Sequence, residues 1–159
     1  MIEIERKFLV VSDEWKVHPS VLVRQGYLST DPDRTVRVRT CGNKAWLTIK
    51  GAVRGLSRQE YEYPVPIEEA EALLKLCHLP LIQKYRFRVL HGDMVWEIDE
   101  FIKENRGLVI AEIELKSERQ KFARPEWLGA EVTHDTRFYN SNLMLRPFST
   151  WPSGEKPLG

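Results

Sequence analysis

Apolar and polar residues alternate along most of the chain, in short segments that are rich in β-branched and aromatic residues and separated by turn residues. This period of two is typical of β-strands whose two faces meet different environments. We count about eight such strands, so the sequence predicts an antiparallel sheet that is closed or nearly closed on itself. Seven of the expected strands cover residues 2–10, 21–29, 45–50, 58–66, 82–90, 94–101 and 109–116, and one more contains Val36 and Val38.

The helical signals are fewer. Pro66 begins a segment with two glutamates in its first turn and apolar residues at helical spacing up to Cys77, which predicts a helix over 66–77 that Pro80 prevents from continuing. Weaker helical patterns cover 118–122 and 138–145. Proline, glycine and serine are frequent after Pro147, so we expect one domain over 1–146 and a tail over 147–159.

The polar faces of the strands carry charges in rows of one sign. Four strands have two acids at alternate positions, and these pairs are Glu3/Glu5, Glu60/Glu62, Glu97/Asp99 and Glu112/Glu114. Basic residues repeat at the same spacing in Arg37/Arg39 and Lys84/Arg86, and Lys7 and Lys50 stand singly. A solvated sheet face accounts for any one such pair, because an antiparallel sheet with one wet face also alternates apolar and charged residues.

Segregation of the charges favours a second interpretation. Ordinary wet faces intersperse the two signs and avoid neighbouring like charges. If the charged faces point into a barrel, carboxylates converge on one side and cations on the other, which is costly unless a ligand compensates both. A ligand that contains both a divalent metal and phosphate groups meets that requirement.

Composition narrows the classes of partner. The 159 residues suit a single domain, and the net charge of +1 gives no sign of a nucleic-acid or membrane binder. Cys41 and Cys77 lie far apart without a metal-binding spacing, so we expect free thiols in a reducing compartment. The acidic amino terminus does not resemble a signal peptide, and we expect a cytoplasmic protein.

The ordered charged rows resemble a known family. Glu3-x-Glu5-x-Lys7 is similar to the ExExK signature of the CYTH superfamily, the triphosphate tunnel metalloenzymes, and the likeness extends through the other rows to about residue 145. It is closest to small bacterial members that share segments such as Arg-Gln-Gly-Tyr-Leu and Leu-Ser-Arg-Gln-Glu-Tyr-Glu. This resemblance implies an α+β, mainly β fold: an eight-stranded antiparallel closed β-barrel with a few flanking helices. It also implies hydrolysis of inorganic tripolyphosphate with Mg²⁺ or Mn²⁺.

Roles follow from the chemistry of the side chains. Carboxylates suit these hard cations, and the leading metal ligands are Glu3, Glu5, Glu112 and Glu114. A second metal, or the attacking water, could be held by Glu60, Glu62, Glu97 and Asp99; we take the first two as catalytic candidates and the last two as metal ligands. The expected triphosphate cradle comprises Lys7, Arg37, Arg39, Lys50, Lys84 and Arg86.

Two further candidates are less direct. The match to the Arg-Gln-Gly-Tyr segment suggests that Tyr27 points inward beside Lys50, where the two could orient or deprotonate water; a tyrosine packed in the barrel wall is the alternative. Relatives often have Asp-Lys-Arg-Tyr near the carboxyl end, whereas this chain has Asp135-Thr136-Arg137-Phe138. Arg137 is therefore a candidate substrate ligand that could instead pair with an acid.

The expected function is the release of a terminal phosphate from tripolyphosphate. Other triphosphate reactions on the same scaffold are alternatives, namely thiamine triphosphate hydrolysis, nucleoside triphosphate hydrolysis and class IV adenylate cyclase chemistry. A non-catalytic polyphosphate-binding module is a further one. We expect a small-molecule triphosphate as the partner, no nucleic acid or membrane, and a possible homodimer.

Overall fold

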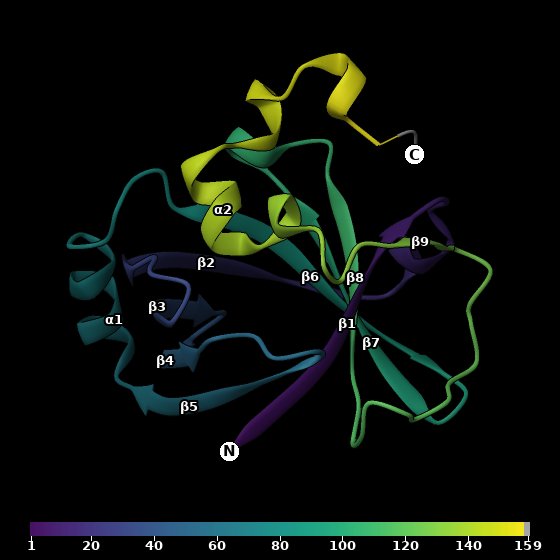
Figure 1. Cartoon of the computed structure of the whole chain (residues 1–159). Helices are drawn as coiled ribbons and strands as arrows, with labels where there is room; N and C mark the ends of the chain where they lie inside the picture. Colours follow the sequence, from purple (N-terminus) through teal and green to yellow (C-terminus); the bar gives the residue numbers. More distant parts are fainter. Residues whose placement is uncertain (158–159) are drawn as a thin grey trace.

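The strands of the protein close into a barrel, as Figure 1 shows. The computed structural model describes residues 1–157. Its strands are β1 (Ile2–Val10), β2 (Ser20–Ser29), β3 (Arg34–Cys41), β4 (Lys44–Gly51), β5 (Ser57–Val65), β6 (Ile82–His91), β7 (Met94–Phe101), β8 (Val109–Glu114) and β9 (Leu128–Glu131). They are hydrogen-bonded in the order β5-β4-β3-β2-β6-β7-β8-β1-β9, and every pairing is antiparallel.

The first strand closes the barrel. Residues Ile2 to Ile4 pair with β5, whereas Glu5 to Leu9 pair with β8, so β1 joins the two ends of an eight-stranded sheet. The short β9 pairs with β1 from outside this circle. The closed eight-stranded antiparallel barrel predicted from the sequence is confirmed, and β9 is an addition that its four residues did not reveal.

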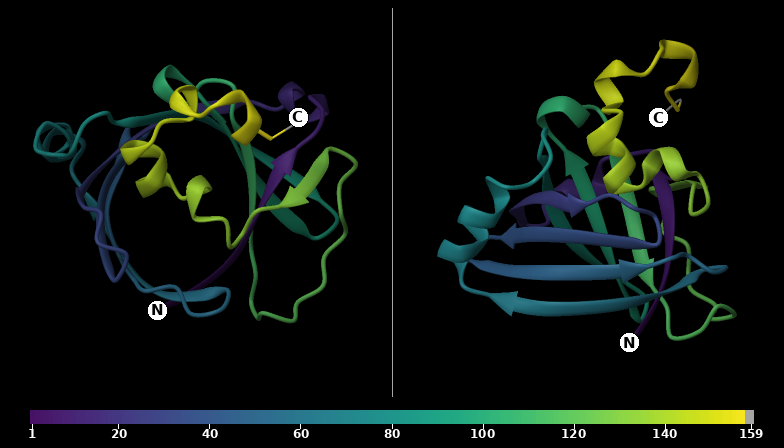
Figure 2. Two further views of the ribbon diagram at one scale, coloured as in Figure 1. Left: turned by 45° about the horizontal axis from the view of Figure 1, so that its top comes forward. Right: turned by 60° about the vertical axis from the view of Figure 1, so that its left-hand side comes forward.

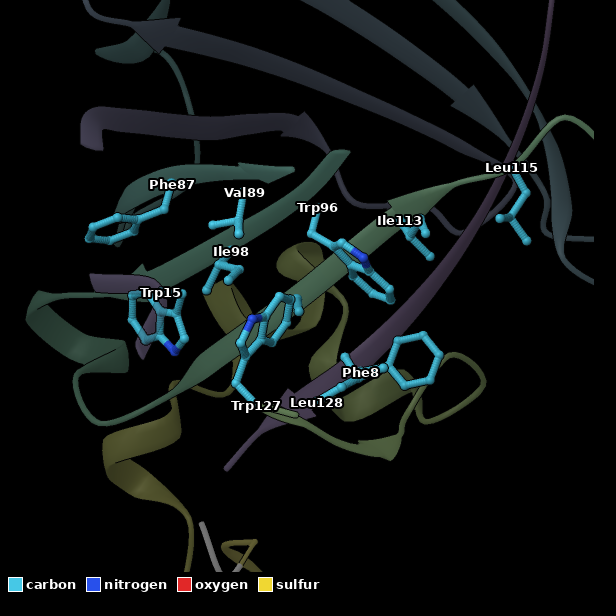
Figure 3. Close-up of a cluster of buried hydrophobic side chains, with 11 residues drawn as sticks. Phe8, Trp15, Phe87, Val89, Trp96, Ile98, Ile113, Leu115, Trp127 and Leu128 are labelled. Carbon is cyan, nitrogen blue, oxygen red and sulfur yellow. The ribbon is translucent and has the colours of Figure 1, made fainter. Parts of the chain in front are cut away.

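The main hydrophobic core lies outside the barrel wall, as Figure 3 shows. The outward side chains of β1, β6, β7 and β8 are covered by the 3₁₀ helix η1 (Glu14–Val17) and by the segment that leads to β9. Trp96 packs edge-on against Phe8 and Trp127, with ring centroids 5.7 and 5.6 Å apart. Each such aromatic pair contributes about 0.5–1.5 kcal/mol beyond its buried area. This placement of the core leaves the interior to polar side chains.

Helix α1 (Ile67–Leu74) covers another part of the outer wall. Its Ala70 and Leu74 pack with Cys77 against Val38 and Ala45. On the neighbouring strand β2, a Cβ atom at Gly26 would lie 2.6 Å from the Cβ of Cys77, so only glycine permits this approach. The observed helix is shorter than the predicted span of 66–77.

The carboxyl-terminal part of the chain caps one end of the barrel (Figure 2). It contains α2 (Asn140–Leu145) and the 3₁₀ helices η3 (Thr136–Phe138), η4 (Phe148–Thr150) and η5 (Ser153–Glu155), and η2 (Lys103–Asn105) lies beside it. Phe148 and Trp151 are buried against Phe138. The prediction of a loose tail after residue 146 was therefore wrong for 148–151, because two aromatic side chains anchor this segment.

The two remaining helical predictions have different outcomes. Helix α2 confirms the later part of the candidate at 138–145, whereas 118–122 forms a turn and irregular backbone. Within residues 1–157, no helix is both long and apolar enough to cross a membrane.

Candidate functional site

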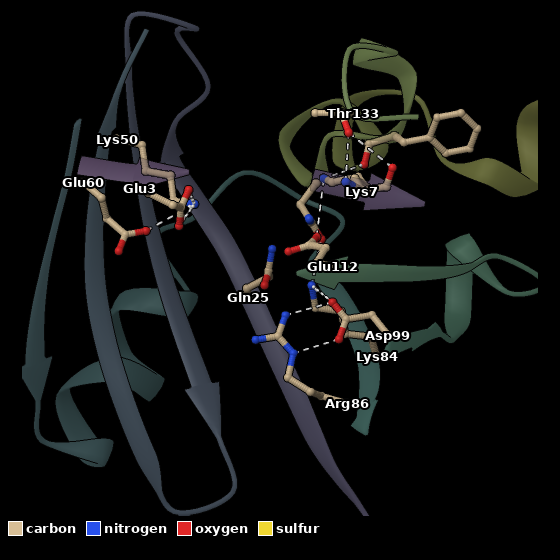
Figure 4. A network of polar contacts seen from close by, with 12 residues as sticks. Glu3, Lys7, Gln25, Lys50, Glu60, Lys84, Arg86, Asp99, Glu112 and Thr133 are labelled. Atoms are coloured by element: carbon tan, nitrogen blue, oxygen red, sulfur yellow. Dashed lines mark hydrogen bonds and ion pairs between the residues drawn. The ribbon is translucent and has the colours of Figure 1, made fainter. Parts of the chain in front are cut away.

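The charged row of β1 faces the barrel interior. Lys50 of β4 donates to both carboxylate oxygens of Glu3, at 2.7 and 3.0 Å, and its Nζ lies 3.3 Å from Glu60. Burial lowers the pKa of Lys50, but Glu5 and Glu3 outweigh this effect and raise it. Lys50 is therefore a buried cation held between acids of β1 and β5 (Figure 4).

Lys7 links β1 to β8 and to the cap. Its Nζ lies 3.5 Å from Glu112, donates to the Phe138 carbonyl at 3.4 Å and stands 5.4 Å from the ring centre of Tyr139. Burial opposes its charge, but Glu112 and Glu5 raise the pKa of Lys7. In turn, burial raises and Lys7 lowers the pKa of Glu112, which falls to about 2.

A second charged group is almost completely buried. Asp99 accepts hydrogen bonds from Nε and Nη2 of Arg86 at 2.8 and 2.9 Å, and its Oδ2 lies 2.8 Å from Nζ of Lys84. Arg86 and Lys84 outweigh burial and hold the pKa of Asp99 well below its usual range. Burial lowers the pKa of Lys84 to about 8 despite this carboxylate. Both oxygens of Asp99 are thus occupied by cations, and Lys84 also donates to Asn140 at 3.0 Å.

The arginines of β3 retain unused donors. Glu62 lies 3.8 Å from Arg37 and 3.4 Å from Arg39, and it accepts a hydrogen bond from Thr48 at 2.9 Å. The Nε atoms of both arginines are buried and have no hydrogen-bond partner among residues 1–157. Burial, together with Arg37, lowers the pKa of Arg39 to about 10. These two N–H groups can therefore bind an anion.

One cavity of about 370 Å³ opens between these rows and the cap. Of the predicted site residues, those that line it are Glu3, Glu5, Lys7, Tyr27, Arg37 and Lys50. Arg58 also lines it, whereas the Arg86–Asp99–Lys84 group does not. The cavity therefore brings acids and bases together in one lining, where Lys50 lies against Glu3 and Lys7 shares the row of β1 with Glu3 and Glu5.

Two of the acids predicted for the site form no ion pair within residues 1–157. Glu5 and Glu114 pair in register across β1 and β8, and neither forms an ion pair with residues 1–157. Burial and the charge of Glu112 raise the pKa of Glu5 to about 7, and partial burial with Glu3 raises the pKa of Glu114. No three Asp, Glu, His or Cys side chains in this range form a ready-made metal cluster.

Two other residues predicted for the site, Glu97 and Arg137, do not line the cavity. Glu97 lies 3.3 Å from both Arg86 and Arg88, and the Arg88 side chain is 71% exposed. Arg137 is outside the cavity, where its guanidinium binds both oxygens of Asp135 and stacks near Trp151. These contacts match the pairing with an acid that the sequence left open for Arg137, and they do not support its place in the triphosphate cradle.

Tyr27 is buried and points into the cavity, together with Lys50. Its hydroxyl accepts a hydrogen bond from Gln25 at 3.3 Å. Sequence reasoning missed Gln25, Thr48 and Asn140, since an uncharged polar side chain in a strand or at the start of a helix stands out from no pattern. Gln25 belongs to the Arg-Gln-Gly-Tyr segment that indicated Tyr27, and this was the one sequence signal close to it.

Comparisons with known proteins agree on one family. The CYTH domain model matches residues 1–141. An inorganic triphosphatase of Acetivibrio thermocellus is 48% identical over 94% of this chain and 97% of its own, and one of Nitrosomonas europaea is 38% identical over 91% and 98%. A crystal structure of an inorganic triphosphatase superposes with a TM-score of 0.65 at 34% identity, covering 90% of this chain and 94% of that one.

Proposed function

The chain belongs to the CYTH family, and on this premise we propose that it is an inorganic triphosphatase, which hydrolyses tripolyphosphate to pyrophosphate and phosphate with a divalent metal. One observation carries the proposal: the lining of one cavity contains the acids Glu3 and Glu5 together with the bases Lys7, Arg37 and Lys50. A polyanion alone would be repelled by the acids, and a metal alone by the bases. A metal–triphosphate complex offers a cation to the acids and phosphate oxygens to the bases.

The donor set fits Mg²⁺ or Mn²⁺. Carboxylate oxygens are the ligands that these cations prefer. Glu5 and Glu114 lie close to other acids, and the nearby Lys50 offsets only part of the effect that raises the pKa of both carboxyls. We assign these two as the principal ligands, with Glu3 and Glu112 beside them. When bound, the metal would neutralise phosphate charge and polarise a phosphoryl oxygen. Whether Glu97 contributes to a second metal stays a prediction.

The contacts reduce the number of residues that we expect to bind the substrate. Lys7, Lys50 and Arg37 line the cavity, and Arg37 keeps an unpartnered Nε donor; Arg39, two residues further along β3, has the same unused donor but does not line the cavity. Arginine N–H groups bind phosphate oxygens and stabilise the charge that develops during transfer. Lys84 and Arg86 are held by Asp99, so we assign them, with Asp99, to the support of the tunnel rather than to direct ligation.

The proton from water requires an acceptor. Glu62 is held by Thr48 and Arg39, and Glu60 lies 3.3 Å from Lys50. Both carboxylates lie next to residues that line the cavity, so they are the candidate bases. Tyr27 accepts from Gln25 and can therefore donate its own hydrogen into the cavity. Water attacks the terminal phosphorus while the cations hold the pyrophosphate leaving group.

A substrate panel tests this function. Purified protein with Mg²⁺ or Mn²⁺ is assayed for phosphate release from tripolyphosphate, pyrophosphate, ATP and thiamine triphosphate, and for cyclic AMP formation from ATP. We expect tripolyphosphate to give the highest kcat/KM. Cyclic AMP as the main product would support the cyclase alternative, and tight binding without turnover would support a polyphosphate-binding module.

A pair of variants distinguishes metal-dependent turnover by this protein from the activity of a contaminating enzyme. Glu5→Gln removes a cavity carboxylate, and we expect it to abolish the metal-dependent turnover. Glu126→Gln removes an exposed carboxylate far along the chain and is the matched control, with turnover equal to wild type. The predictions of a cytoplasmic location, a homodimer and no nucleic-acid or membrane partner remain untested predictions.

A further inference from the structure

Asn140 is an uncharged residue of the cap that lies between the cavity and a buried cation. It is the first residue of α2, is half-buried, and lines the cavity together with Lys7. Its Oδ1 accepts a hydrogen bond from Nζ of Lys84 at 3.0 Å, which is the one hydrogen bond of this side chain within residues 1–157. Lys84 is 1% exposed and does not line the cavity. The amide of Asn140 is therefore the group that separates this ammonium from the open space of the tunnel.

The contact with Lys84 determines how the amide is oriented. An ammonium group has only donors, so the atom of Asn140 that faces Nζ is the oxygen and not the nitrogen. With Oδ1 turned towards Lys84, which lies outside the cavity lining, Nδ2 is the atom left for the cavity. This nitrogen carries two N–H donors, and phosphate oxygens are acceptors. The orientation therefore suits an anion and not a cation.

The two residues before Asn140 contact a cation that does line the cavity. Nζ of Lys7 donates to the carbonyl of Phe138 at 3.4 Å and lies 5.4 Å from the ring centre of Tyr139. Lys7, Tyr139 and Asn140 all line the cavity. The short segment 138–140 thus contacts Lys7 at one end and Lys84 at the other. A phosphoryl group bound by Lys7 lies on the same side of the cavity as the Asn140 amide.

We propose that Asn140 is a further substrate-binding residue of the triphosphatase, whose Nδ2 donates a hydrogen bond to a phosphoryl oxygen of tripolyphosphate while Lys84 holds its Oδ1; this inference rests on the function proposed above. The amide takes no proton and forms no bond to phosphorus. Its contribution is to the affinity for the chain at the cap end of the tunnel. Lys84 acts on the substrate through this amide, because its own ammonium is covered by Asp99 and Asn140.

The test measures kcat and KM for tripolyphosphate with Mg²⁺ in two variants. Asn140→Asp keeps an oxygen for Lys84 but removes the donor, and Asn140→Ala removes both polar atoms without adding charge. A hydrogen bond to a charged group corresponds to about 10- to 100-fold in binding, so we expect KM to rise at least about tenfold in both variants, with kcat within about threefold. If Asn140→Ala fails to fold, as judged by thermal unfolding, Asn140→Asp decides. A residue that only accepted from Lys84 would give Asn140→Asp a wild-type KM, and that result, or a lower kcat with unchanged KM, would overturn the assignment.

Asn142 provides the matched control. It is the same residue type on the same helix and lines the same cavity, but its Nδ2 already donates to the carbonyl of Thr136 at 2.7 Å. Asn142→Ala should therefore keep a wild-type KM, and Asn142→Asp, which adds the same charge, should raise KM less than Asn140→Asp. Equal increases at the two positions would overturn the assignment. Wild-type protein without tripolyphosphate turnover would refute the proposed function itself, whereas an active wild type with an unchanged KM in Asn140→Asp refutes this inference alone.

Discussion

Replacing Asp99 with asparagine tests whether this carboxylate supports the tunnel or binds metal. Asp99 and Lys84 are each 1% exposed, and the carboxylate holds two cations through three contacts of 2.8–2.9 Å. Asparagine keeps the shape but removes the charge, so Lys84 loses its ion pair and Arg86 keeps only the contact with Glu97 at 3.3 Å. The sequence placed Asp99 among the metal ligands, whereas its contacts in the structure assign it to the two cations.

The magnitude follows from burial. Breaking a buried ion pair from one side costs about 3–5 kcal/mol. Lys84 has a pKa of about 8 and can give up its proton at modest cost, so we expect the lower part of that range, about 3–4 kcal/mol. For a chain of this size, that loss lowers Tm by roughly 6–16 °C.

The assay is thermal and urea unfolding of both proteins in EDTA, with and without added Mg²⁺. Glu71→Gln provides the control, because the Arg24–Glu71 pair is 33% and 46% exposed and should contribute less than about 1 kcal/mol. Wild-type stability of metal-free Asp99→Asn, combined with loss of the stabilisation by Mg²⁺, would refute the supporting role and restore Asp99 to the metal ligands.

Three other predictions concern the interior and the cap. Glu5→Gln should keep the wild-type circular dichroism spectrum and lose Mg²⁺-dependent turnover; an active variant would contradict the metal assignment. The pKa of Glu5 is about 7 in the folded protein and lies above its unfolded value, so the folded state binds this proton at higher pH than the unfolded state. Metal-free wild type should therefore gain stability as the pH falls from 7.5 to 5.5. Relative to Glu5→Gln, the gain is up to about 1.4 kcal/mol per pH unit. Equal urea midpoints of the two proteins across that range would exclude the effect. Trp151→Ala should cost about 3–5 kcal/mol because the ring is 4% exposed against Phe138 and Phe148; an unchanged Tm would show that the cap is peripheral.

Much of the barrel could be predicted because alternation is a local property. Each strand shows which residues share a face, and one register error would have turned Glu5 and Lys7 outward. The strand β9 and the segment 117–127 carry no such pattern, since their Phe122, Trp127 and Leu128 are placed by packing against Trp96 and its neighbours. Their structure depends on tertiary packing, which spacing along the chain does not encode.

The composition of the site was predictable, but its pairings were not. Sequence indicated that acids and bases face the interior, and the charged residues Glu3, Glu5, Lys7, Arg37 and Lys50 do line the cavity. The register between β6 and β7 sets Arg86 opposite Asp99, and this choice makes one acid a partner of cations while Glu5 remains unpaired. Gln25 was missed because it carries no charge, and its unpartnered amide oxygen can be recognised only in the structure.

The position of β1 also determines how late the barrel can form. Glu5 pairs with Glu114, and Lys7 with Glu112, so the strand made first acquires these neighbours only after more than one hundred further residues. Contacts this distant in sequence make folding slow, because the entropy of loop closure is lost before the contacts stabilise the chain. Refolding should therefore be limited by formation of the β1–β8 seam.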